Sequence, residues 1–216
     1  RLRIDGKIQA DSAVTTNLAT GYIDLTPFDP GPSQVEGRLY YNDEYKALTV
    51  YNDITGSSLQ VGHEEWVRVY NNSGSLITNG TPVYVTGATG ETPTIAPADA
   101  TTEAKAQVLG IATNDIADLS EGVVTVRGLI SGINTSAIAA GSRVHLSAAG
   151  GYTDASPTYP YFPVDLGWCV VSDSSAGYIY VTVQEHHLET LRVTGNTHMG
   201  GNLTVDGDLT VNGTQS

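Results

Sequence analysis

VVTVRGLIS, residues 123–131, is one of five stretches in which apolar and polar side chains alternate along the chain. Alternation with a period of two is typical of a β-strand that buries one face, because successive side chains of a strand point to opposite sides. The other four stretches are WVRVY (66–70), PVYVT (82–86), RVHLS (143–147) and YIYVTVQ (178–184). Two longer apolar runs, at 107–113 and 166–171, indicate strands that are buried on both faces.

Turn-forming residues separate these stretches. Clusters of Gly, Asn and Pro lie between them at spacings that suit a sandwich or a barrel. Only ADATTEAKAQ (98–107) has helical propensity, and it predicts at most about two or three turns of helix. We therefore predict an all-β fold in which residues 66–184 form a compact β-barrel or β-sandwich module.

A six-residue phrase repeats near the C-terminal end of the sequence. Four hexads follow one another: LRVTGN (191–196), THMGGN (197–202), LTVDGD (203–208) and LTVNGT (209–214). The first and third residues of each hexad would lie on one face of an extended strand, because side chains alternate. These predicted shaft core residues are Leu191, Val193, Met199, Leu203, Val205, Leu209 and Val211. The fifth position is always a glycine, which suits a turn, namely Gly195, Gly201, Gly207 and Gly213.

One copy of the four hexads cannot enclose a core, because repeat architectures need several stacked units to bury a continuous apolar face. We therefore predict that three identical chains wind around a common axis into a β-helical rod, with Gly207 and Gly213 at positive φ in its corners. A meander packed on the preceding domain stays open as the alternative. LRIDGK (2–7) repeats the register of the hexads, so we expect this chain to be a segment of a longer rod.

The predicted organisation has five parts. Residues 1–26 are shaft-like, 27–65 contain a Pro/Gly linker and a tyrosine-rich β-hairpin, 66–184 form the β module, 185–190 are a connector, and 191–216 carry the hexads. In the hairpin, RLYYNDEYKALTVYND (38–53), two apolar strands flank a polar turn. Its tyrosines suit either a sugar-binding platform or a staple that holds the hairpin to its neighbour.

The composition narrows the choice of partners. The chain has 10 Lys and Arg against 23 Asp and Glu, a net charge of −13. This balance disfavours nucleic acid and anionic membranes, because binding to phosphates needs clustered cations. The sequence has no apolar run long enough to span a membrane, and its first residues do not show the basic-then-apolar pattern of a signal peptide. The single cysteine, Cys169, lies in the apolar run LGWCVV, where we expect a buried and unreactive thiol.

The sequence predicts no catalytic residue and no cofactor. GATGETPT (87–94) lacks the Gly-Lys-Ser/Thr ending of a phosphate-binding loop and is interpreted as a glycine turn. The carboxylates of Glu64-Glu65 and Asp43-Glu44 are adjacent in sequence, so within a strand they would face opposite ways.

The five histidines give one candidate metal site. His145 alternates with two apolar residues, so we expect it on the protein surface or on a face of the barrel. His186 and His187 lie between the β module and the hexads, where three chains would bring three copies of each near one axis. A trimer could then supply three or six imidazole nitrogens to a transition metal. The alternative is a pair of solvated linker histidines.

Several stretches resemble the tail fibres and other virion fibre proteins of tailed bacteriophages. NGTPVYVTGATG, VLGIATNDIADLSEGVVTVRGLISGINTSAIAAGSRVHLSAAGGYT and LGWCVVSDSSAGYIYVTVQ, within residues 79–184, are similar to a β-rich module of these proteins. The hairpin GRLYYNDEYKALTVYN and the closing GGNLTVDGDLTVNG are similar to fibre sequences as well. The resemblance implies a virion surface protein that is usually trimeric, and it brings no catalytic residues with it.

The function that follows is structural. We expect a segment of a homotrimeric phage fibre or spike on the virion, which contacts neighbouring virion proteins and contributes to host attachment. The candidate receptor is a host surface glycan, bound by exposed loops near 87–93, 148–163 and 172–176. The candidate contact rings are Tyr152, Tyr159, Tyr161 and Phe162.

Two alternatives stay open. One is a capsid decoration protein or a head-fibre trimer. The other is a hexapeptide-repeat acyltransferase, although four hexads make little more than one coil of that fold.

Overall fold

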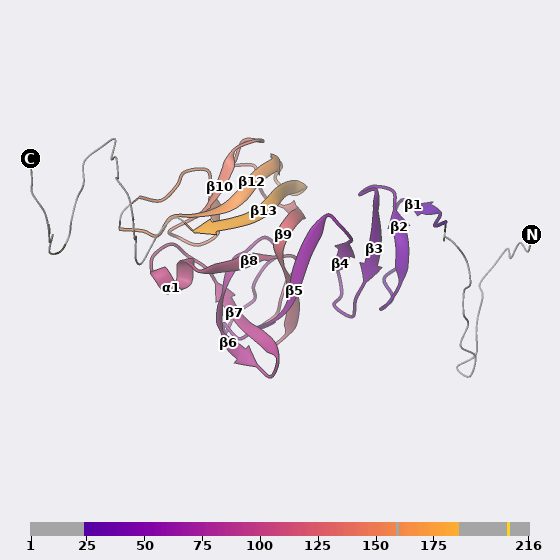
Figure 1. Ribbon diagram of the computed structural model, residues 1–216, viewed down its shortest axis with the longest axis horizontal. Coiled ribbons are helices and arrows are strands. Elements are labelled where there is room, and N and C mark those ends of the chain that lie inside the picture. The colour runs from indigo at the N-terminus through magenta and orange to yellow at the C-terminus, as the bar shows by residue number, and fades with distance from the viewer. Residues whose placement is uncertain (1–23, 159, 186–206, 208–216) are drawn as a thin grey trace, which may run out of the picture. The chain divides into compact units, whose positions relative to one another are not determined.

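The computed structural model describes residues 24–158, 160–185 and 207. These residues form an almost entirely β structure with one short helix, α1 (Glu103–Ala106), so the predicted all-β class is confirmed (Figure 1). The strands in chain order are β1 (Pro27–Phe28), β2 (Leu39–Asn42), β3 (Ala47–Tyr51), β4 (Ser58–Gln60), β5 (Glu64–Asn71), β6 (Pro82–Thr89), β7 (Thr92–Pro97), β8 (Val108–Ala112), β9 (Glu121–Ile133), β10 (Arg143–Leu146), β11 (Tyr152–Thr153), β12 (Val164–Val171) and β13 (Gly177–Glu185).

Five of the strands form a closed barrel, which decides between the predicted barrel and sandwich. Its strands follow the order β9, β5, β7, β6 and β8, and β8 pairs with β9 again to close the ring. The closing ladder is short, with Ile111 opposite Thr125 and Ala112 opposite Val124. The buried residues of the barrel core are Val69, Ile77, Val83, Ile95, Ala112, Ile116 and Val124.

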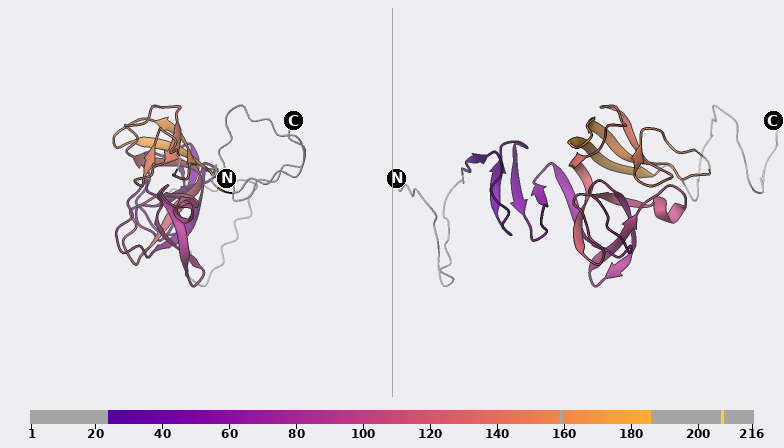
Figure 2. Two further views of the ribbon diagram at one scale, coloured as in Figure 1. Left: turned by 90° about the vertical axis from the view of Figure 1, so that its left-hand side faces the viewer. Right: turned by 180° about the vertical axis from the view of Figure 1, so that it is seen from behind.

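Strand β9 is long enough to belong to two layers. Its first half pairs with β5 and β8 in the barrel, and its second half pairs with β13 from Arg127 to Ile133. Strands β12, β10 and β11 follow β13, and we call this part of the large sheet, from Arg127 onward, the extension sheet. Two views show β10, β12 and β13 lying over one side of the barrel (Figures 1 and 2).

A second apolar core lies on the inner face of the extension sheet. Ile130, Cys169, Ile179 and Val181 belong to this buried cluster, together with residues of β8 and α1. Cys169 is 1% exposed, and its thiol donates to the Ile138 carbonyl at 3.6 Å. The expected burial of Cys169 is therefore confirmed.

The alternating stretches all form strands, but one prediction about burial is wrong. The apolar run at 166–171 was expected to be buried on both faces. In β12 the side chains of Trp168, Val170 and Val171 are 41%, 48% and 40% exposed. Their inward-facing neighbours Leu166 and Cys169 are buried, so one face of β12 carries apolar side chains into solvent.

Strand β7 was missed because it contains Pro93 and Pro97. Proline has no N–H for a sheet ladder, so it argues against a central strand. The structure resolves the conflict by keeping the β5–β7 ladder short, with only Tyr70 opposite Thr94 and Asn71 opposite Ile95. Both prolines lie outside these two pairs and belong to the β6–β7 ladder, with Pro97 opposite Val83 and Pro93 opposite Ala88. Gly90 turns at φ 61° between β6 and β7, as expected for a glycine turn in 87–94.

The small sheet has the order β1-β2-β3-β4 and is stapled to the Pro-rich segment before it. The Tyr40 and Tyr51 rings lie 5.2 Å apart between centroids, and the Tyr51 hydroxyl donates to the Pro32 carbonyl at 2.9 Å. Gln34 donates to the carbonyl of Ile54 at 2.8 Å and so holds the β3–β4 loop. Of the two roles that the sequence leaves open for the hairpin tyrosines, Tyr40 and Tyr51 therefore have the structural one, which is to hold the hairpin to its neighbour.

Most of the predicted shaft lies outside the described residues. This applies to residues 1–23, to the connector from 186, and to every hexad residue except Gly207. Gly207 is exposed in a bend. The expected positive φ at Gly207 and Gly213, like the other expectations for the hexads, stays a prediction. Within the described part of the chain, no helix is long and apolar enough to cross a membrane.

Candidate functional site

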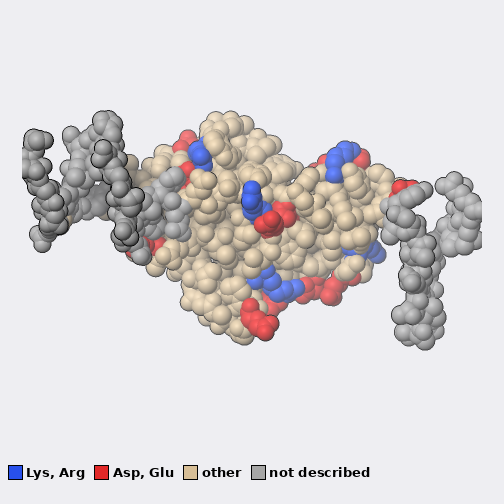
Figure 3. Space-filling model, in the orientation of Figure 1, with Lys and Arg blue, Asp and Glu red and all other residues tan. Residues whose placement is uncertain are grey.

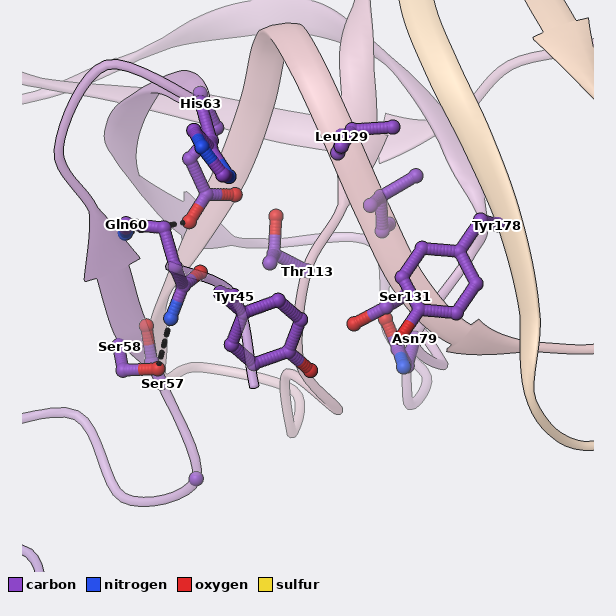
Figure 4. A pocket seen from close by; sticks show the side chains of 13 residues that line it. Tyr45, Ser57, Ser58, Gln60, His63, Asn79, Thr113, Leu129, Ser131 and Tyr178 are labelled. Atoms are coloured by element: carbon purple, nitrogen blue, oxygen red, sulfur yellow. Dashed lines mark hydrogen bonds between the residues drawn. The ribbon is translucent and has the colours of Figure 1, made fainter. Parts of the chain in front are cut away.

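A pocket of about 220 Å³ opens where the small sheet meets the barrel and the extension sheet. It brings together residues that are far apart in sequence, from the β2–β3 turn to β13. Figure 4 shows the labelled side chains around this common space, with two tyrosine rings among amide and hydroxyl groups. Tyr45, Gln60, Glu64, Asn79, Ser131 and Tyr178 are the lining residues that carry most of its chemistry.

Tyr45 is presented by a rigid turn. The buried Asn42 side chain accepts hydrogen bonds from the backbone N–H groups of Glu44 at 2.9 Å and Tyr45 at 3.2 Å. An Asn side chain that bonds the backbone two or three residues later imitates a turn and fixes its path. Lys46 completes the turn at φ 51°. The sequence Asn-Asp-Glu-Tyr-Lys thus positions the Tyr45 ring in the pocket.

Tyr178 faces Tyr45 from strand β13. Its neighbour Ile179 points into the core, so Tyr178 lies on the outer face of the extension sheet. Burial raises the pKa of the Tyr178 hydroxyl, and the nearby Tyr45 and Glu44 raise it further. Tyr178 therefore keeps its proton at neutral pH and can donate and accept hydrogen bonds.

Glu64 provides a buried carboxyl at the start of β5. It is 8% exposed and accepts hydrogen bonds from the backbone N–H of Gln60 at 3.0 Å and the Thr125 hydroxyl at 3.4 Å. Burial raises the pKa of this carboxyl, and the two hydrogen bonds oppose the rise. Glu65 beside it is exposed, so the prediction that these two adjacent carboxylates face opposite ways is confirmed.

A glycine allows this edge of the pocket to form. Glu64 pairs with Gly128 across the β5–β9 ladder, where Gly128 has a φ of 108°. A Cβ at Gly128 would lie 2.2 Å from the His63 carbonyl oxygen and 2.5 Å from the Glu64 Cα. Only glycine lets the two strands approach this closely.

A second pocket, of about 210 Å³, lies next to the first and shares His63 and Glu64 with it. Tyr180 and Arg127 help to line it. Cross-strand pairing extends this surface, because Tyr180 is opposite Trp168 on β12. Together the two pockets and Trp168 form a surface with three aromatic rings on one sheet face: Tyr178, Tyr180 and Trp168.

An ion pair fixes the far end of this surface. The Arg143 guanidinium lies 4.3 Å from the centroid of the Trp168 ring and 3.0 Å from the Asp165 carboxylate. His145 Nδ1 lies 2.7 Å from the other oxygen of Asp165, which is 5% exposed. This arrangement limits the motion of Trp168, since cation–π contact adds to its packing. His145 lies half-buried on the outer face of the extension sheet, between the buried Val144 and Leu146. It therefore points away from the core, as expected, but from the extension sheet and not from the barrel.

The rings expected to contact a receptor have different environments. Tyr152 and Phe162 are half-buried and pack against the second core, and the Tyr152 hydroxyl donates to the Asn134 carbonyl at 2.7 Å. Tyr161 is 43% exposed. Tyr159 is outside the described residues. Of the described rings in this loop, Tyr161 is the one free to meet a large partner.

The candidate metal ligands His186 and His187 lie outside the described residues, as do the shaft core residues and Gly195, Gly201 and Gly213. In the ranges 24–158 and 160–185, no group of three or more His, Cys, Asp or Glu side chains is placed to hold a metal ion.

Sequence reasoning missed the pocket itself. Tyr45 could be found as a hairpin tyrosine, and Tyr178 and Tyr180 as the outward positions of an alternating strand. Nothing in the order of residues shows that the hairpin turn and β13 meet.

Comparison of the chain with models of known protein families found no match, and a search of curated proteins found none either.

Proposed function

We propose that this chain is a structural segment of a homotrimeric bacteriophage fibre or spike, which contributes to virion architecture and to host attachment. The repeated hexads carry the proposal. Their apolar residues, such as Leu203, Val205, Leu209 and Val211, recur in a register that one copy cannot bury. Three chains around one axis would cover these residues and hide the strand edges that otherwise recruit other chains.

The described fold supports a modular segment. The buried cores are built from residues of β5 to β13 and the loops between them, and the barrel ring closes on itself. A barrel with its own core can form a wider node on a shaft without depending on the shaft for its folding. The resemblance of residues 79–184 to virion fibre modules points the same way.

The surface also suits a particle that meets other molecules. On the face shown in Figure 3, Lys and Arg side chains are few and lie next to Asp and Glu. The outer face of β12 and β13 exposes Trp168, Val170 and Tyr180, although large apolar side chains are usually buried. Contacts with neighbouring virion proteins and with a host surface would use such faces.

Electron microscopy of the purified chain tests the proposal. We expect particles with threefold symmetry, in which a thin rod leaves a wider node. Compact particles without threefold symmetry would refute the fibre assignment.

A further inference from the structure

The structure also points to a ligand class for the pocket between the small sheet and the barrel. We infer that this pocket binds a neutral pyranose, with the sugar ring against Tyr45 and Tyr178. The inference rests on the proposed role in host attachment and gives it a location. That location differs from the loops that the sequence singled out.

The first argument is the ring geometry. Tyr45 is fixed by the Asn42 turn, and Tyr178 is fixed in a strand whose next residue is core. A pyranose has one face of C–H bonds that packs against an aromatic ring, and tyrosine adds a hydroxyl at its edge. Rigid rings lose little conformational entropy when a ligand binds, so the site is preorganised.

The second argument is the polar lining. Amides and hydroxyls surround the rings: Gln60, Asn79, Thr113 and Ser131 line the pocket. The Asn79 side-chain oxygen is buried and has no hydrogen-bond partner in the described structure. An acceptor of this kind is costly unless a donor satisfies it. A sugar hydroxyl supplies both donor and acceptor, which amide and hydroxyl groups can match.

The third argument is charge. The first pocket has no Lys or Arg among its lining residues; besides its two tyrosines, its ionisable side chains are His63 and Glu64, and burial raises the pKa of the Glu64 carboxyl. The chain as a whole carries a net charge of −13. An acidic sugar or a phosphate would bring a negative charge to a site where His63 is the single lining residue that could pair with it and where the Glu64 carboxyl lies nearby, and burial of an unpaired charge is unfavourable. The pocket therefore favours a neutral sugar over a uronic or sialic acid.

Saturation-transfer NMR on the full chain provides the test. The probes are the methyl glycosides of neutral hexoses and N-acetylhexosamines, with the glycoside of a uronic acid as the charged counterpart. We expect transfer from aromatic protons to the C–H protons of at least one neutral sugar and none to the uronic acid. Absence of transfer to every neutral sugar at millimolar concentration would overturn the inference, as would equal or stronger transfer to the uronic acid.

Variants locate the site. Tyr45→Ala and Tyr178→Ala should each weaken binding by about tenfold or more, since each removes a stacking ring. Tyr45→Phe keeps the ring and should retain most of the affinity, which separates loss of stacking from loss of fold. Tyr161→Ala is the matched control, because this exposed tyrosine lies outside the pocket. Unchanged binding in both pocket variants, or loss in Tyr161→Ala alone, would place the sugar elsewhere.

The result is separable from the oligomeric state. Tyr45, Gln60, Asn79 and Tyr178 all belong to one chain, so a monomer that binds sugar would support the pocket and refute the fibre. A trimer that binds no neutral sugar would support the fibre and refute the pocket.

Discussion

At the scale of single residues, Glu64 lines the pocket and also makes the free energy of unfolding depend on pH. Burial raises the pKa of its carboxyl above the ordinary value of 4.5. Between the two pKa values the folded chain binds more protons than the unfolded chain, so the free energy of unfolding falls as the pH rises through this window. Glu64→Gln removes the titrating group and keeps an oxygen that can accept from the Gln60 N–H.

The expected result is a flatter pH dependence. Urea unfolding followed by the fluorescence of the two tryptophans, from pH 4.5 to neutral, should show less loss of stability in Glu64→Gln than in the parent. Glu65→Gln is the control, because Glu65 is exposed and lacks the contacts that surround the buried Glu64 carboxyl. If Glu64→Gln and the parent lose stability equally over this range, the carboxyl is not buried as described.

At this same scale, the alternation of apolar and polar residues predicted burial well where only one face of a strand packs against a core. Val69 and Leu146 were identifiable from alternation alone. Trp168 and Val170 were not, because an apolar run has the same letters whether its second face meets protein or solvent. Asp165 shows a further limit: its burial depends on Arg143 and His145, which lie on another strand.

At the scale of secondary-structure elements, the approach of β5 to β9 depends on Gly128. Gly128→Ala should lower the free energy of unfolding by more than the ~1–3 kcal/mol of backbone strain alone, because the Cβ also meets the His63 carbonyl. Gly62→Ala is a matched control, since Gly62 has a φ of 87° and open space around the added Cβ. Urea denaturation compares the two variants. An equal effect of both would mean that the close β5–β9 contact is not needed.

The positions of the strands could be predicted from sequence better than the pairing of one strand with another. Hydrophobic alternation located β5, β6, β9, β10 and β13. The first half of β9 is nevertheless buried on both faces, because Val123, Val124 and Thr125 are all buried. Prolines hid β7, whose ladder with β5 is only two residue pairs long. The pairing of β8 with β9 that closes the barrel, and the meeting of the Tyr45 turn with β13, are contacts between distant residues. No local pattern encodes them.

At the scale of the whole molecule, the shaft should depend on its inward face. Leu203→Asp would place three carboxylates near one axis, where desolvation and mutual repulsion oppose their charged form. We expect this variant to lose the trimer while the barrel stays folded. Limited proteolysis should then cut beyond about residue 190, in the hexads, and spare the closed barrel. Thr204→Asp, at the outward-facing neighbour, should behave like the parent. Protease resistance of Leu203→Asp equal to that of the parent would contradict the proposed packing of the hexads.

The mass of the assembly in solution tests the central claim most directly. Light scattering on the full chain, coupled to size-exclusion chromatography, measures this mass without reference to shape. A homotrimer predicts three times the 22.7 kDa of one chain, independent of concentration over the range in which the particle is stable. A stable, folded species of 22.7 kDa would contradict the account, because the hexads would then have found their partners within a single chain.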